Sequence, residues 1–142
     1  METLKHNGFS LIELLITLSI WILLLSLSVP VLISLQEKKT EDNFLLTLQN
    51  DIIYIQNVSL GSKTYNRIIL DRYSYRIVDN KNASIVRNLP DGWEIDRRTL
   101  EEISFNRNGT IRKAGTIQIR TKQNKFNMIF PIGKGRGYLE KQ

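Results

Sequence analysis

The feature that most constrains this chain is a run of 23 residues without a charged side chain, residues 14–36, close to its start. A helix rises about 1.5 Å per residue, so a helix of this length crosses a hydrocarbon layer of about 30 Å. We therefore expect residues 9–36 to form a membrane-spanning helix. Glu13 interrupts the longer apolar run that begins at Phe9, and a carboxylate inside such a run costs about 2.5–3.5 kcal/mol to insert. The sequence thus predicts that something compensates this charge.

Three interpretations of the start of the chain compete. A secretory signal peptide has a shorter apolar region followed by small residues at its cleavage site, whereas the first alanine of this chain is Ala83. A plain membrane anchor explains the length of the run, but it explains neither the Gly8-Phe9 junction nor Glu13. The third interpretation takes these residues together with the short polar leader that precedes them.

The segment Gly8-Phe9-Ser10-Leu11-Ile12-Glu13 resembles the class III signal of type IV prepilins. The resemblance implies that residues 1–8 are a leader, that a prepilin peptidase cuts between Gly8 and Phe9, that Phe9 is then N-methylated, and that Glu13 is needed for filament assembly. It also implies a single-pass protein of the cell membrane, with its N-terminus cytoplasmic before cleavage and with a place in a cell-surface filament afterwards.

The resemblance suggests what could compensate Glu13. Cleavage would create a cationic α-amine on Phe9, and a neighbouring subunit could present that amine to Glu13 inside the filament. In the alternative, Glu13 is protonated or reaches the membrane interface.

A second periodic pattern follows the apolar run. Apolar residues recur at three- and four-residue spacing, which is typical of one face of a helix: Phe44, Leu45, Leu48, Ile52 and Ile55. We expect one nearly continuous helix over residues 10–60 that ends near Gly61. Pro30 lacks a backbone N–H and should loosen or kink it.

Beyond Gly61 the sequence has the features of strands separated by turns. The expected strands are residues 65–70, 73–78, 83–87, 93–95, 103–105, 115–121 and 125–132. In the sixth strand we expect Ile117 and Ile119 to point inward, and Gln118 and Arg120 outward. The fold class is therefore α+β, with a long N-terminal helix packed on a small antiparallel β-sheet head, and residues 37–142 hold the second half of the helix and that head.

The C-terminal half is similar to the minor pilins of the group that includes GspH and FimT. The similarity lies in residues 103–109, in the Gly-led strand that begins at Gly115, and in Gly135-Arg136. The cysteine-free head and residues 113–117 are most similar to the ComGD type of minor pseudopilin, from the competence machinery of Gram-positive bacteria. The resemblance implies a pilin-like fold, major and other minor pilins as partners, and a role in DNA uptake during transformation. The alternative is a minor pseudopilin of a type II secretion system or of a twitching pilus.

The net charge of +6 is concentrated in the C-terminal third. Residues 1–96 hold 9 Lys/Arg and 11 Asp/Glu, whereas residues 97–142 hold 11 Lys/Arg and 3 Asp/Glu. This asymmetry favours a polyanionic partner, either nucleic acid or an anionic envelope polymer, although it also fits an ordinary solvated surface. FimT-like proteins are thought to bind DNA through their C-terminal region, which implies the following residues here: Lys134 and Arg136, with Arg120, Lys122 and Lys125 extending the patch and Tyr138 available for stacking on a base. The alternative is a flexible glycine-rich tail.

The composition excludes several kinds of catalytic site. Cysteine is absent, and the only histidine is His6, in the leader, so no Ser-His or Cys-His pair can form. Residues 133–137 are glycine-rich but lack the spacing of a P-loop. Glu101-Glu102 has no histidine or cysteine nearby, and we expect it to be the solvated start of a strand. We therefore expect a protein that is not an enzyme and has no cofactor or metal. The prepilin resemblance implies that the chain is itself the substrate of a peptidase.

Overall fold

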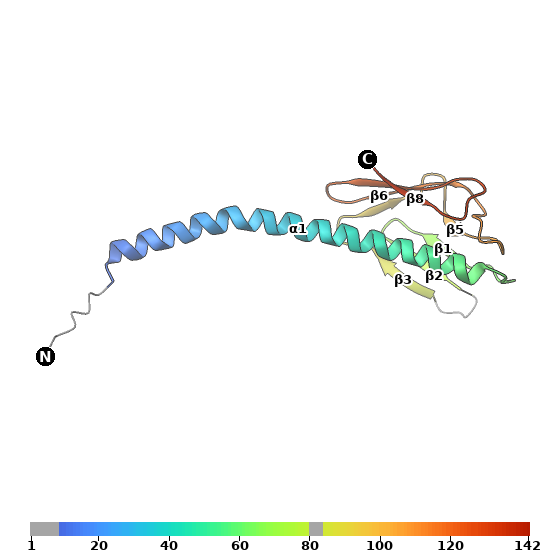
Figure 1. Ribbon diagram of the computed structural model, residues 1–142, viewed down its shortest axis with the longest axis horizontal. Helices are drawn as coiled ribbons and strands as arrows, with labels where there is room; N and C mark the ends of the chain where they lie inside the picture. Colours follow the sequence, from blue (N-terminus) through green and yellow to red (C-terminus); the bar gives the residue numbers. More distant parts are fainter. Residues whose placement is uncertain (1–8, 80–83) are drawn as a thin grey trace. The chain divides into compact units, whose positions relative to one another are not determined.

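The computed structural model describes residues 9–79 and 84–142, which form one helix and eight strands (Figure 1). Helix α1 spans Leu11–Ser59. The strands are β1 (Arg67–Leu70), β2 (Ser74–Val78), β3 (Ser84–Asn88), β4 (Glu94–Asp96), β5 (Glu102–Ser104), β6 (Gly115–Arg120), β7 (Lys125–Phe130) and β8 (Tyr138–Lys141). The chain divides into two compact units, Met1–Asp42 and Asn43–Gln142, and α1 contributes to both.

The limits of α1 confirm the long helix expected from the sequence. At its start, the carbonyl of Ser10 accepts the N–H of Leu14 at 3.1 Å. At its end, Gly61 has a φ of 68°, the left-handed conformation that commonly terminates helices and that glycine adopts without strain. Pro30 lies inside the helix and does not end it.

In the first unit, every side chain from Phe9 to Gln36 is exposed. Four hydroxyl groups in this segment, those of Thr17, Ser19, Ser26 and Ser28, donate to carbonyls three or four residues earlier, at 2.7–2.9 Å. Because these hydroxyls are satisfied by their own helix, they can enter an apolar phase at little cost. By length and composition, this part of α1 is a candidate membrane span.

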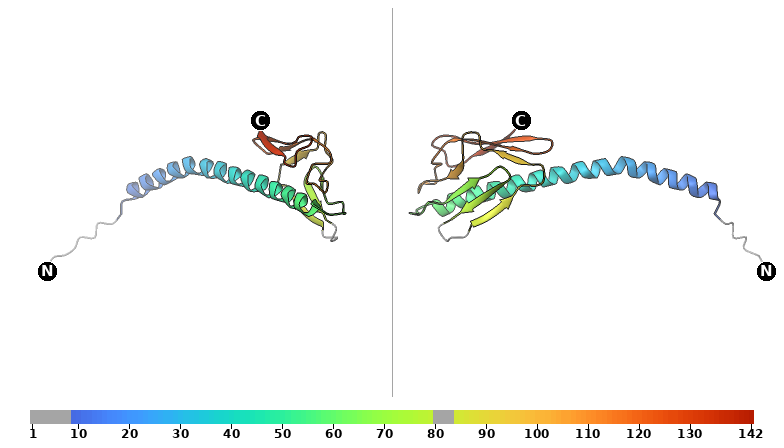
Figure 2. Two further views of the ribbon diagram at one scale, coloured as in Figure 1. Left: turned by 45° about the vertical axis from the view of Figure 1, so that its right-hand side comes forward. Right: turned by 180° about the vertical axis from the view of Figure 1, so that it is seen from behind.

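The second unit contains two antiparallel sheets of four strands each. Their strand orders are β3-β2-β1-β5 and β4-β6-β7-β8. The two sheets and the second half of α1 can be followed from two further sides in Figure 2. The predicted α+β class and the helix packed on antiparallel sheet are confirmed, whereas the division into two sheets could not be read from the sequence.

The core of the second unit forms where α1 meets the sheets. Leu48 and Ile55 are fully buried, and they share one cluster with Ile68 and Ile77 of the first sheet and Ile117 of the second. These helical residues belong to the three- and four-residue pattern seen in the sequence, so the pattern predicted the buried face correctly.

Strand β8 was not predicted. The expectation that the last strand spans residues 125–132 was wrong, because β7 ends at Phe130 and Tyr138–Lys141 returns to pair with it, Ile129 opposite Tyr138. Gly133, with a φ of 73°, helps the chain turn back. The strand is hard to recognise in sequence because it is an edge strand with no buried residue, so its polar and apolar residues show no alternation.

The expectation that Gln118 points outward into solvent was also wrong. Gln118 is only 2% exposed, and its side-chain amide donates to Asn127 Oδ1 and to Gln142 Oε1, each at 3.1 Å. Gln118 faces Asn127 directly in the β6–β7 register, so two amides on adjacent central strands satisfy each other and exclude water.

Candidate nucleic-acid interface

The N-terminal motif is described from Phe9 onward, and Gly8 with the predicted leader lies outside the described residues. The side chain of Phe9 is 71% exposed. Glu13 accepts a hydrogen bond at Oε2 from the backbone N–H of Ser10, at 3.3 Å. Ser10 and Glu13 have the Ser-x-x-Glu spacing of a capping box, a local signal that would have predicted this contact. Glu13 therefore has a partner at its own helix N-terminus, where the helix dipole also favours a carboxylate.

The five predicted DNA-contacting cations do not form one patch. The β6–β7 ladder runs from the pair Gly115–Phe130 at one end to the pair Arg120–Lys125 at the other. These ends are about 17 Å apart at about 3.4 Å per residue. Residues 131–137, with Lys134 and Arg136, follow the first end, whereas Arg120, Lys122 and Lys125 lie at the hairpin tip at the second. The hairpin cations therefore lie at the opposite end of the ladder from Lys134 and Arg136.

Arg120 differs from the other predicted cations because its charge is compensated. Its guanidinium binds Glu94 Oε1 at 2.9 Å and Asp96 Oδ2 at 2.8 Å, and its Nε donates to Gln118 Oε1 at 3.0 Å. Glu94 also binds Arg72 at 2.8 Å, and the hydrogen bonds from Arg72 and then Arg120 lower the pKa of Glu94. Arg120 thus ties β4 to β6, which leaves Lys122 and Lys125 as the exposed cations of the hairpin tip.

A cavity of about 360 Å³ lies beside these ion pairs. It is lined by Arg72, Glu94, Ile95, Asp96, Arg97, Arg98 and Arg120. Arg98 has a φ of 44°, and its backbone N–H donates to Asp96 Oδ1 at 3.1 Å, which holds the turn after β4. Because two carboxylates line the cavity together with its arginines, it is a less favourable place for a polyanion than a surface whose cations lack carboxylate neighbours.

Residues 131–137 are held against α1 by one side chain. Nε2 of Gln56 donates to the carbonyl oxygens of Gly109 and Gly135, each at 2.6 Å. Arg136 lines a groove of about 340 Å³ whose other lining residues include Ile53 of α1 and Phe130 of β7. The segment is therefore anchored by its backbone, and its two cations are displayed from a fixed loop. Tyr138 is 54% exposed on the edge strand β8.

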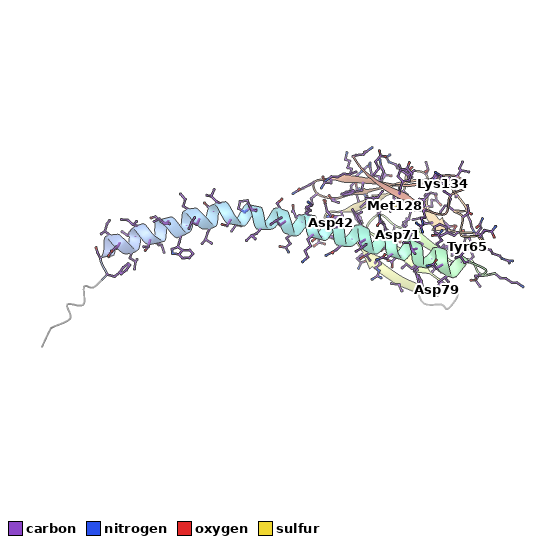
Figure 3. The ribbon with its side chains drawn as sticks, in the orientation of Figure 1. Asp42, Tyr65, Asp71, Asp79, Met128 and Lys134 are labelled. Carbon is purple, nitrogen blue, oxygen red and sulfur yellow. The ribbon has the colours of Figure 1, made fainter. Side chains whose placement is uncertain are left out.

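The structure brings other residues next to Lys134 that the charge pattern did not predict. The backbone carbonyl of Lys134 accepts the N–H of Ile111 at 3.4 Å, and the N–H of Arg112 donates to Ser104 O at 2.9 Å. Three loops and a strand end therefore meet here, and we call their displayed side chains the basic loop surface: Tyr65, Arg67, Arg107, Arg112 and Lys134. Figure 3 labels Tyr65 and Lys134 at this end of the head. These residues come from three separate stretches of the sequence, 65–67, 107–112 and 134, so the charge count did not indicate that they lie close together.

Comparisons with protein-family models, with curated proteins and with solved structures found no match to this chain. The candidate site is described by its own residues: an exposed apolar half-helix with a capped N-terminus, and a β head in which the five predicted DNA-contacting cations lie in two separate groups.

Proposed function

We propose that this protein is a minor pseudopilin of a type IV pilus-like competence machine, assembled into a filament and supporting DNA binding and uptake during transformation. The observation that carries the proposal is the first half of α1, whose side chains from Phe9 to Gln36 are all exposed. A surface of this size and apolarity needs lipid before assembly and the helices of other subunits after it. The second half of the same helix is built into a compact head, which would remain outside the membrane.

In this proposal the chain is first processed in the membrane and then assembled into a filament. The uncut protein crosses the cell membrane once, and a prepilin peptidase cuts between Gly8 and Phe9. The methylated α-amine of Phe9 then enters a filament of major and other minor pilins at the cell surface, close to a carboxylate of Glu13. The pilin-like layout of apolar helix and antiparallel head supports this assignment.

The DNA-binding part of the proposal rests on charge. Residues 97–142 hold 11 Lys/Arg against 3 Asp/Glu, and Lys134 and Arg136 are exposed on a loop whose backbone is anchored by Gln56. Cations displayed in this way neutralise phosphates without reading bases, as uptake of DNA of any sequence requires.

Two measurements test the two parts separately. The mass of the mature chain from its native membrane should correspond to a start at Phe9 carrying one methyl group, and recovery of intact Met1 would overturn the filament assignment. The full chain in zwitterionic nanodiscs should bind DNA with an affinity that falls steeply between about 50 mM and 200 mM salt. A processed, filament-incorporated protein that shows no salt-dependent DNA affinity would instead belong to a secretion or twitching system.

A further inference from the structure

We infer that the basic loop surface is the principal DNA phosphate-binding site of the head, and that Arg112, held against the ring of Tyr65, makes its main contact. This inference rests on the proposed function and deepens it, because it assigns the contact to residues that the C-terminal charge pattern does not single out. It also predicts that the hairpin tip, although basic, contributes little.

The side chain of Arg112 is held in a defined orientation. Its Nε donates to the backbone carbonyl of Phe105 at 3.0 Å, and its guanidinium carbon lies 5.2 Å from the centroid of the Tyr65 ring. A guanidinium has five N–H donors in a fixed plane, so the bond from Nε leaves the four on the terminal nitrogens for a ligand. Because the group is already oriented, less conformational entropy is lost when it binds a phosphate.

The acidic residue beside this ring is already engaged by other groups. The Tyr65 hydroxyl donates to Glu102 Oε1, and Arg67 lies 3.5 Å from Glu102 Oε2. Arg67 is also 5.1 Å from the centroid of the same ring. Glu102 is therefore occupied by Arg67 and Tyr65, whereas Arg112 forms no ion pair with a carboxylate within the described residues. An arginine stacked on an aromatic ring keeps its N–H edge available, which suits a phosphate oxygen.

Two further cations lie on loops that adjoin Arg112. Arg107 and Lys134 are exposed, and backbone bonds join the loops that carry them: Gly61 donates to Arg107 O at 3.1 Å, and Ile111 donates to Lys134 O. Cations fixed on adjoining loops can bind successive phosphates of one strand, and each phosphate neutralised releases condensed counterions.

The exposed part of the Tyr65 ring favours DNA over other phosphodiester polymers. Tyr65 is 45% exposed, and guanidinium planes next to it extend its stacking surface. Unpaired bases stack on such surfaces, whereas a polymer of glycerol phosphate has nothing to stack. The site should therefore bind single-stranded DNA more tightly than poly(glycerol phosphate) with the same number of phosphates.

The test uses the full chain in zwitterionic nanodiscs and the fluorescence anisotropy of a labelled single-stranded DNA. Arg112→Ala should weaken binding about tenfold and reduce the slope of log affinity against log salt by about one. Lys122→Ala is the matched control, because it removes one exposed cation from the hairpin tip, and it should change affinity less than about twofold. If both variants lose affinity for DNA equally, the basic loop surface is not the principal site, but the proposal that the protein binds DNA is retained.

Two further variants separate geometry from charge. Arg112→Lys should restore the salt slope but not the full affinity, since lysine lacks the planar guanidinium with its paired N–H donors. Full restoration of affinity would overturn the role of the stacked geometry.

Tyr65→Leu tests the contribution of the aromatic ring and should weaken DNA binding. Equal affinity of the parent for DNA and poly(glycerol phosphate) would overturn the assignment to DNA. Amide hydrogen exchange of the core strands checks that each variant remains folded. If the unsubstituted protein binds no DNA, both this site and the proposed role in DNA uptake are overturned. The proposed role in a filament is tested separately, by the mass of the mature chain.

Discussion

The two halves of α1 are both rich in apolar side chains, but they use them in opposite ways. In the second half, Leu48 and Ile55 are fully buried against the sheets of the head. In the first half, Trp21 is 65% exposed and Leu23 is 61% exposed, and none of the side chains from Phe9 to Gln36 is covered. The apolar surface of the second half is covered by the head, whereas that of the first half is not covered by any of the described residues and requires an apolar environment.

The carboxylates of the two halves show the same contrast. Asp51 is 8% exposed, accepts the hydroxyl of Tyr75 at 2.7 Å, and lies 3.1 Å from Arg87 Nε. Glu13 accepts one backbone N–H of its own first turn, from Ser10, and among residues 9–79 and 84–142 its carboxylate has no other hydrogen bond or ion pair. In the head, a tyrosine and an arginine therefore compensate the charge of Asp51. The carboxylate of Glu13, in contrast, can accept a partner from another molecule.

The largest expected effect comes from removing that carboxylate. Glu13→Ala should leave membrane insertion intact but abolish incorporation into filaments, because the α-amine of the neighbouring subunit loses its counter-charge. Membrane fractionation and analysis of sheared filaments measure the two steps. Glu13→Gln is the informative control, since it keeps an oxygen able to cap Ser10 but removes the charge. Normal assembly of the glutamine variant would assign the role of Glu13 to the cap, and normal assembly of both variants would contradict any role.

A smaller effect, on the stability of the head, tests the contrast between the apolar surfaces. Leu48→Ala should lower the free energy of unfolding by about 2–5 kcal/mol, because it leaves a cavity between α1 and the sheets. Leu23→Ala removes the same atoms from the exposed half, and it should change that free energy by less than about 0.5 kcal/mol. Urea denaturation in micelles, followed through amide hydrogen exchange of β1 and β6, reports the head alone. Similar losses in both variants would show that the halves are not independent.

The next prediction concerns the way in which α1 positions the candidate site. Gln56→Ala should cost about 1–3 kcal/mol, because the carbonyls of Gly109 and Gly135 lose their common donor. Amide exchange in residues 106–111 and 131–137 should accelerate. Gln49→Ala, at a position that lines the same groove, is the control and should leave this exchange unchanged. Unaltered exchange in the Gln56 variant would mean that other contacts hold these loops.

The smallest expected effect concerns the hydrogen bond between Tyr75 and Asp51. Tyr75→Phe should cost about 1 kcal/mol at neutral pH through the loss of this bond. Burial, and then the hydrogen bond to Asp51, raises the pKa of Tyr75 in the folded head above its unfolded value of about 10. The folded state therefore binds this proton more tightly, and the associated stability is fully present below pH 10 and is lost as the pH rises further.

Denaturation across this alkaline range measures the effect, and Tyr75→Phe should flatten the decline. Tyr138→Phe, which removes an exposed hydroxyl, serves as the control and should decline as the parent does. An equally steep decline in Tyr75→Phe would assign the alkaline loss to other groups.

The local features of the fold were predictable, and the non-local ones were not. The limits of α1 and the hairpin of β1 and β2 follow from residue spacing and turn residues that lie within a few positions of each other. Strand β8 and the burial of Gln118 depend on partners in β7, which no local pattern encodes. The same limit applies to the site, because the capping pair Ser10 and Glu13 is readable from its spacing, whereas the proximity of Tyr65, Arg112 and Lys134 is not.

The sequence by itself determined that the chain has an uncharged apolar half-helix, an acidic residue at its start and an α+β head with a basic C-terminal third. These properties depend only on residue counts and on residue spacing along the chain, so they can be read without knowledge of the fold. Only the tertiary structure decided which cations lie near one another. Antiparallel pairing of β6 with β7 places Arg120, Lys122 and Lys125 at one end of a ladder and Lys134 at the other. Ion pairing then compensates Arg120 and leaves Arg112 with its guanidinium edge available.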